Sequence, residues 1–175
     1  MMTRGEVLQE NWLNIMTGLM HETRDDVANY RDNDLGGTLL HAAVDRQDED
    51  ALKIADEMIK KGVDINVQDA RGFTALHYAS CPTMINFLIQ SGAKVDCLSN
   101  NLATPLMLRI GDKHEDAALL LLKHDADPHL VPLNGSSPYR QAKMLKLTRF
   151  TQAVQPEPIS QVLPEIVPSE RSYSW

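Results

Sequence analysis

The chain has 175 residues, with 17 Lys and Arg against 24 Asp and Glu, which gives a formal net charge of −7. Hydrophobic residues make up 43% and charged residues 23%, which is typical of a soluble globular protein and excludes a fibrous or largely disordered chain. The acidic balance argues against a nucleic-acid binder, which needs a basic surface to displace counterions from phosphates. The length fits one domain, and no apolar run approaches the roughly 18 residues of a membrane span.

Residues 3–32 predict an N-terminal helical cap. Thr23-Arg24-Asp25-Asp26 has the form of a capping box that opens a short helix ending at Tyr30. The preceding segment shows no secretory signal, because polar residues interrupt its apolar run. An apolar stripe at helical spacing predicts an earlier helix, and its members are Leu8, Trp12, Ile15, Met16 and Leu19.

Four similar hexamers follow the predicted cap. They begin at Thr38, Thr74, Thr104 and Ser137, at spacings of 36, 30 and 33 residues, and the first two end in Leu-His-Ala-Ala and Leu-His-Tyr-Ala. Segments such as Lys-Gly-Val-Asp at residues 61–64 recur in phase with the hexamers. This periodicity predicts a repeat array. The predicted units are residues 33–66, 69–98, 99–131 and a partial C-terminal capping unit at 132–154.

Each unit predicts two helices. Thr or Ser can cap the first helix, and Pro105 and Pro138 occupy the first turn, where the missing N–H costs nothing. Gly62 and Gly92 supply the left-handed residue after the second helix, and Asp125 takes that place in unit three. Apolar residues at helical spacing mark the second helices, including Leu52, Met58, Ile85, Leu88, Ala118 and Leu121.

The units are irregular. Unit one carries about three extra residues near 45–50, whereas unit two has lost about three, so we expect residues 80–83 to turn sharply with Thr83 as the helix cap. In unit three, Met107 and Arg109 replace the His and the second Ala of the hexamer, and Leu102 replaces the turn Gly.

The hexamers resemble the T-P-L-H-x-A signature of the ankyrin repeat, whose unit has about 33 residues. The resemblance implies an all-α solenoid of stacked helix-turn-helix units joined by short hairpin loops. It also implies that His41 and His77 make structural hydrogen bonds between loops.

The C-terminal part changes in character. Residues 137–154 predict a final helical pair with a solvated outer side, where Arg140, Lys143, Lys146 and Arg149 recur every three residues; contact with an anionic surface is an open alternative for this strip. Residues 155–175 contain four prolines and no glycine, which predicts a disordered tail. The last four residues, 172–175, could instead form a short recognition peptide.

No residue pattern indicates catalysis. The six histidines make neither HExxH nor a Cys/His cluster with metal spacing, and no phosphate-binding or nucleophile motif is present. We therefore expect no enzyme activity, no metal and no cofactor. Cys81 and Cys97 are expected to be reduced thiols, and Cys81 is interpreted as a small buried residue and not as a nucleophile.

The ankyrin resemblance implies a concave binding face built from hairpin tips and first helices. Phe73 and Tyr78 are the expected anchors, because aromatic residues and Arg dominate binding hot spots. A Phe at an exposed tip has no folding reason to be there, although it could instead pack back onto unit three. The full set of candidate partner-binding residues is Leu35, Ala70, Arg71, Phe73, Tyr78, Asn100, Asn101, Ala103, Leu108, Asn134 and Ser136.

These observations predict a monomeric, cytoplasmic, non-catalytic protein–protein interaction module that binds a folded protein partner and no nucleic acid. Two alternatives remain open on the sequence. One is a regulatory inhibitor of a kinase or transcription factor, similar to small ankyrin inhibitors. The other is a bacterial effector delivered into the cytosol of a host cell.

Overall fold

The structure, a computed structural model, describes residues 30–31, 35–46, 50–131 and 135–154. The described residues form helices and loops and contain no strand, as the predicted all-α class requires. The predicted N-terminal cap, apart from Tyr30 and Arg31, lies outside the described residues, as do Asn134 and the predicted tail. The helices are α4 (Leu39–Arg46), α5 (Ala51–Lys60), α6 (Ala75–Tyr78), α7 (Pro82–Gln90), α8 (Pro105–Gly111), α9 (Glu115–Lys123), α10 (Pro138–Met144) and α11 (Thr148–Ala153).

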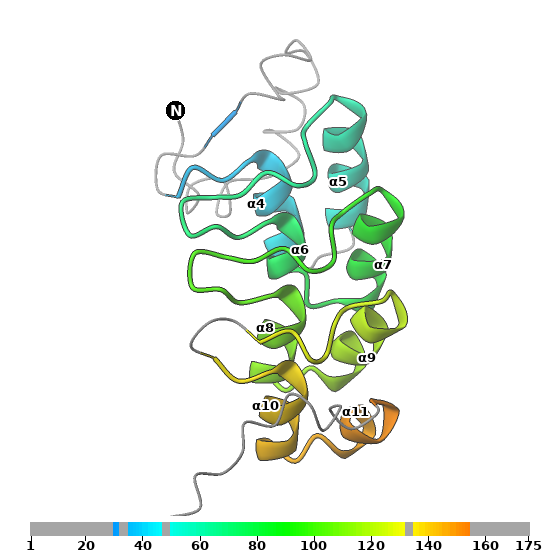
Figure 1. Ribbon diagram of the computed structural model, residues 1–175. Coiled ribbons are helices and arrows are strands. Elements are labelled where there is room, and N and C mark those ends of the chain that lie inside the picture. Colours follow the sequence, from blue (N-terminus) through cyan, green and yellow to red (C-terminus); the bar gives the residue numbers. More distant parts are fainter. Residues whose placement is uncertain (1–29, 32–34, 47–49, 132–134, 155–175) are drawn as a thin grey trace, which may run out of the picture.

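The helices stack in two columns. The first helices of the four units, α4, α6, α8 and α10, lie above one another in one column, and the second helices, α5, α7, α9 and α11, form the other (Figure 1). Loops that connect successive units extend beyond the first-helix column, on the side away from the second helices (Figure 1). We call the side formed by these loops and by the first helices the hairpin face.

Small and apolar side chains allow this close stacking. Leu40, Leu76 and Leu106 occupy equivalent positions in the first helices and are fully buried. Ala43 and Ala79 are buried one turn later, and an alanine at an interhelical contact lets two backbones approach closely. These apolar residues belong to one continuous core that includes residues of all four units.

The helix starts use two capping schemes. Thr104 and Ser137 follow the predicted scheme, since their side-chain oxygens accept the backbone N–H of Met107 at 3.2 Å and of Arg140 at 3.3 Å. The Thr38 hydroxyl instead lies 2.8 Å from the Nδ1 atom of His41, and Thr74 makes the same contact with its own unit's histidine. A histidine therefore completes the cap wherever the hexamer contains one.

The predicted helix ends are confirmed. Gly62, Gly92 and Asp125 have φ angles of 89°, 98° and 63°, which is the left-handed conformation expected after a second helix. Leu102, in the place of the turn glycine, also has a positive φ of 60°.

Unit two differs from its prediction. Helix α7 begins at Pro82 with Cys81 as its N-cap, so the assignment of Thr83 as the cap was wrong. Proline is favoured at the first helical position, because its φ is already helical and an N–H group there would have no acceptor within the helix. The three missing residues come from the first helix, since α6 has 4 residues whereas α8, the first helix of unit three, has 7. Cys81 is also exposed, which contradicts its interpretation as a buried residue.

The last unit presents a basic surface. Arg140, Lys143 and Lys146 are exposed on the α10–α11 pair, as is Arg149, whose guanidinium lies 2.7 Å from the Asp116 carboxylate. None of the helices in the described ranges has the length and apolar character needed to cross a bilayer.

Candidate interaction surface

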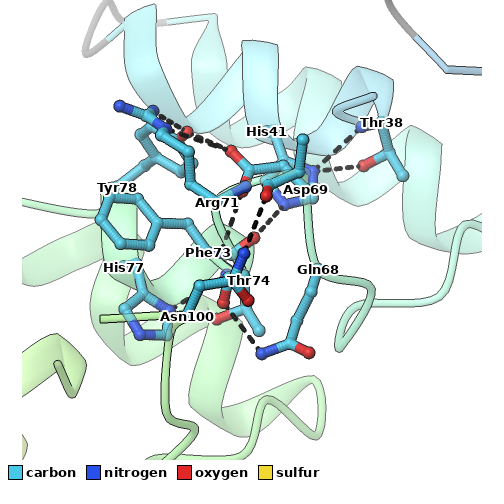
Figure 2. A network of polar contacts seen from close by, with 12 residues as sticks. Thr38, His41, Gln68, Asp69, Arg71, Phe73, Thr74, His77, Tyr78 and Asn100 are labelled. Carbon is cyan, nitrogen blue, oxygen red and sulfur yellow. Dashed lines mark hydrogen bonds and ion pairs between the residues drawn. The ribbon is translucent and has the colours of Figure 1, made fainter. Parts of the chain in front are cut away.

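The hairpin loop at residues 67–73 is organised by the buried carboxylate of Asp69. Its Oδ1 atom accepts the backbone N–H groups of Arg71 and Phe73, each at 2.9 Å. Its Oδ2 atom accepts the Tyr78 hydroxyl, and the Arg71 Nε lies 3.7 Å from it (Figure 2). The Asp69 N–H in turn donates to the Phe73 carbonyl at 2.9 Å, which closes the hairpin. The Asp69 side chain therefore fixes the turn and positions the candidate residues Arg71 and Phe73.

The charge of Asp69 is stabilised by these contacts. Burial alone would raise the pKa of Asp69, but hydrogen bonds from the Tyr78 hydroxyl and from the N–H groups of Phe73 and Arg71 outweigh burial and lower the pKa. This residue was not among those predicted from the sequence. The sequence signal that could have identified Asp69 is an Asp three residues before a turn glycine, because an Asp side chain readily forms hydrogen bonds with the backbone of a turn.

Arg71, Phe73 and Tyr78 form a packed cluster on the hairpin face. The Phe73 ring stacks on the His77 ring with centroids 5.1 Å apart and meets the Tyr78 ring edge-on at 5.6 Å. The Arg71 guanidinium lies 4.8 Å from the Phe73 centroid and 5.4 Å from that of Tyr78, within cation–π range (Figure 2). Phe73 is half-buried against its own unit, so the expectation that this residue has no folding role was wrong.

His41 and His77 link successive units, as the resemblance implied. The His77 Nδ1 accepts the Thr74 N–H at 3.0 Å, and its Nε2 lies 3.1 Å from the Ala103 carbonyl oxygen of the next hairpin. His41 makes the equivalent bonds within unit one and to the Phe73 carbonyl, at 3.0 and 2.9 Å. Because Nδ1 accepts a backbone N–H, each imidazole is neutral with its proton on Nε2.

Adjacent hairpins are also bonded directly. The Ala70 N–H donates to the Leu35 carbonyl at 2.7 Å, and the Asn100 N–H donates to the Arg71 carbonyl at 3.0 Å. The Asn100 side chain donates to the Ala70 carbonyl at 2.8 Å. The polar groups of Leu35, Ala70 and Asn100 are thus engaged between loops, whereas the side chain of Asn101 is exposed.

Two hollows lie along the hairpin face and share Leu108 and Asp112 in their lining. The first hollow, of about 350 Å³, brings together the predicted residues Arg71, Phe73, Tyr78 and Leu108. The second hollow, of about 460 Å³, brings together the predicted residues Asn101, Ala103, Leu108 and Ser136. Leu35, Ala70 and Asn100 line neither hollow.

The lining of these hollows also includes residues that were not predicted. Arg109 and His114 line the first hollow, and Met144, 79% exposed, lines the second. Met144 is the last residue of α10, the first helix of the fourth unit. Its exposure could not be inferred from the sequence, because the same helical pattern also contains buried apolar residues.

The described residues contain no group of three or more His, Cys, Asp or Glu side chains that could hold a metal ion. Cys81 and Cys97 are both free. The hairpin face carries aromatic and cationic side chains beside the two hollows.

Helical pairs stacked in register and joined by bonded hairpins define a helical repeat solenoid. A family model for ankyrin repeats, with three copies, matches residues 9–98 and 40–132, and the chain belongs to this family.

The chain is also similar to parts of larger proteins. It is 35% identical over 85 residues to the human palmitoyltransferase ZDHHC13, an alignment that covers 46% of this chain and 14% of that protein. The Drosophila melanogaster palmitoyltransferase Hip14 is 33% identical over 85 residues, which cover 46% of this chain and 13% of the relative. The human BCL-6 corepressor-like protein 1 is 29% identical over 118 residues, which cover 66% of this chain and 6% of the relative. The chain thus matches only a small part of each of these relatives.

Proposed function

We propose that this chain is a non-catalytic interaction module that binds a folded protein partner through the hairpin face. The observation that carries the proposal is the Arg71–Phe73–Tyr78 cluster, which is held in place by the Asp69 carboxylate and lines the first hollow. Tyr and Arg are enriched at binding hot spots, and side chains that are already ordered lose less entropy on binding.

The two hollows give this surface a definite extent. They share Leu108, a half-buried residue of α8, so a partner that fills both would contact units two, three and four. The exposed Met144 would lie at the far end of that contact, where a flexible thioether can adapt to an apolar partner side chain.

The roles of Phe73 and Tyr78 determine which variants can test the proposal. The Phe73 ring packs on His77, and the Tyr78 hydroxyl donates to Asp69, so truncating either residue would also weaken the fold. Arg71 and Leu108 are better probes. The Arg71 side chain is 48% exposed, and Leu108 lies outside the buried core.

The test compares two double variants as baits. Arg71→Ala with Leu108→Ala alters the hairpin face, whereas Lys53→Ala with Lys94→Ala removes two exposed side chains away from the hollows. A partner captured by the wild type and then purified should bind the first variant about thirtyfold more weakly, which corresponds to about 2 kcal/mol, and should bind the control normally. Equal affinity for the wild type and a folded Arg71/Leu108 variant would overturn the proposal.

A further inference from the structure

Arg109 is a buried charge at a position that is apolar in the other units. The equivalent residues are Ala43, Ala79 and Ala142, and each is buried. Arg109 is only 6% exposed and lines the first hollow. A buried guanidinium is costly to accommodate unless it is paired and fully hydrogen-bonded.

The pairing of Arg109 within the described part of the chain is incomplete. Its Nη2 atom donates to the His77 carbonyl at 3.2 Å and lies 3.2 Å from the Asp112 carboxylate, which is itself 56% exposed. Its Nε atom is buried and has no hydrogen-bond partner among the described residues. Burial lowers the pKa of Arg109, and the Asp112 charge only partly opposes this effect. The guanidinium therefore has hydrogen-bonding capacity that these residues do not use.

Arg71 supplies a second cation to the same hollow. Its guanidinium lies over the Phe73 and Tyr78 rings, and its side chain remains 48% exposed. The Asp69 carboxylate that orients Arg71 is fully buried, so an incoming group meets the guanidinium and not the carboxylate. Among the described residues that line the hollow, Asp112 is the one carboxylate, against two guanidinium groups.

We propose, as a refinement that rests on the proposed function, that the first hollow receives an Asp or Glu side chain of the partner, whose carboxylate pairs with Arg109 and Arg71. Arginine is suited to this role because its planar guanidinium matches a carboxylate and can donate two parallel hydrogen bonds. The aromatic rings and Leu108 supply apolar walls for the methylene groups of the acid. Pairing with a partner carboxylate compensates the buried Arg109 charge, which the exposed Asp112 carboxylate neutralises only in part.

The experiment uses a phage-displayed library of random dodecapeptides, selected on the full chain. Selected peptides should share an acidic residue at one position, and replacing that residue by its amide should weaken binding about tenfold or more by calorimetry. Arg109→Met should remove the preference for acid over amide. Asp112→Asn should raise the affinity of the acidic peptide several-fold, since it removes a like charge from the hollow. Lys94→Met, an exposed cation outside the hollow, should change nothing.

The two variants keep the test interpretable. Arg109→Met removes a buried charge and leaves no unpaired buried charge behind, because its partner Asp112 is exposed, so both proteins should show a normal unfolding transition. An acid preference that survives Arg109→Met, a lower affinity after Asp112→Asn, or selection of peptides without an acidic position would each overturn the inference. Peptides that show no preference for acid over amide, but bind the Arg71/Leu108 variant more weakly, would overturn only this inference. Peptides that bind the Arg71/Leu108 variant as tightly as the wild type would contradict the proposed function as well.

Discussion

Removing the Asp69 carboxylate should destabilise the protein more than removing any single hydrogen bond between its hairpins. Asp69→Ala takes away the acceptor of the Arg71 and Phe73 N–H groups and of the Tyr78 hydroxyl. These three hydrogen bonds, at about 1 kcal/mol each, predict that the free energy of unfolding falls by about 3 kcal/mol. For a domain of this size, the melting temperature should fall by about 10 °C.

The next hairpin offers a matched control for Asp69→Ala. Ser99 occupies the equivalent position, but its side chain accepts one hydrogen bond, from the Ala103 N–H at 3.0 Å. Ser99→Ala should therefore cost about 1 kcal/mol. Urea unfolding followed by circular dichroism gives both values, provided that the denaturant dependence is unchanged. Losses that agree within about 0.5 kcal/mol would refute the assignment of Asp69 as the organiser of its hairpin.

The same carboxylate predicts a pH dependence. The pKa of Asp69 is lowered in the folded protein, so its contribution is fully present above the ordinary value of about 4 and is lost as the pH falls through the folded value. The stability difference between the wild type and Asp69→Ala should consequently shrink as the pH is lowered below about 4. A difference that is constant from pH 7 to pH 3 would contradict this electrostatic explanation.

Three further predictions concern stability. Burial lowers the pKa of His77 despite the hydrogen bond to the next hairpin. The free energy of unfolding should therefore fall as the pH drops below about 6.5. His77→Gln should flatten this pH dependence, as measured by urea titrations. Gly72→Ala should lower the free energy of unfolding by about 2 kcal/mol or more, because φ is 76° and the new Cβ would lie 2.5 Å from the backbone nitrogen of Asn100. Gly92→Ala should lower it by about 1 kcal/mol, because no atom would lie within 4 Å of the new Cβ. Equal losses would contradict the steric argument. Asp125→Gly should stabilise the protein by about 1 kcal/mol, since Asp125 combines a φ of 63° with a negative charge at the end of α9, and a lower melting temperature would count against this reasoning.

The sequence predicted those features that follow from local patterns. Leu40 and Leu76 recur at one position of a repeated hexamer, and a buried position in one unit predicts burial in the next. Gly62 and Gly92 mark helix ends because few other residues tolerate the left-handed conformation there. Recurrence of such local patterns is therefore sufficient to predict an array of helical repeats, and the resemblance to ankyrin repeats implied how the units stack.

Features that depend on side chains meeting in space were harder to predict. The Asp69–Tyr78 hydrogen bond joins residues nine positions apart, from a loop and from a shortened helix. The exposed Cys81 was misjudged because the position of the lost residues within unit two could not be read from spacing alone. Arg109 was recognised as a departure from the repeat, but its place in a hollow depends on how the neighbouring unit packs against it.

Hydrogen–deuterium exchange on a complex with a captured partner tests the central claim most directly. Binding through the hairpin face predicts that the partner slows exchange at residues 67–78 and 97–111, which include two hairpin loops with helices α6 and α8 and border both hollows. Helices α5, α7 and α9 lie in the other column and should exchange as they do in the free chain (Figure 1). Protection confined to that second column, with the hairpin loops unchanged, would contradict binding through the hairpin face.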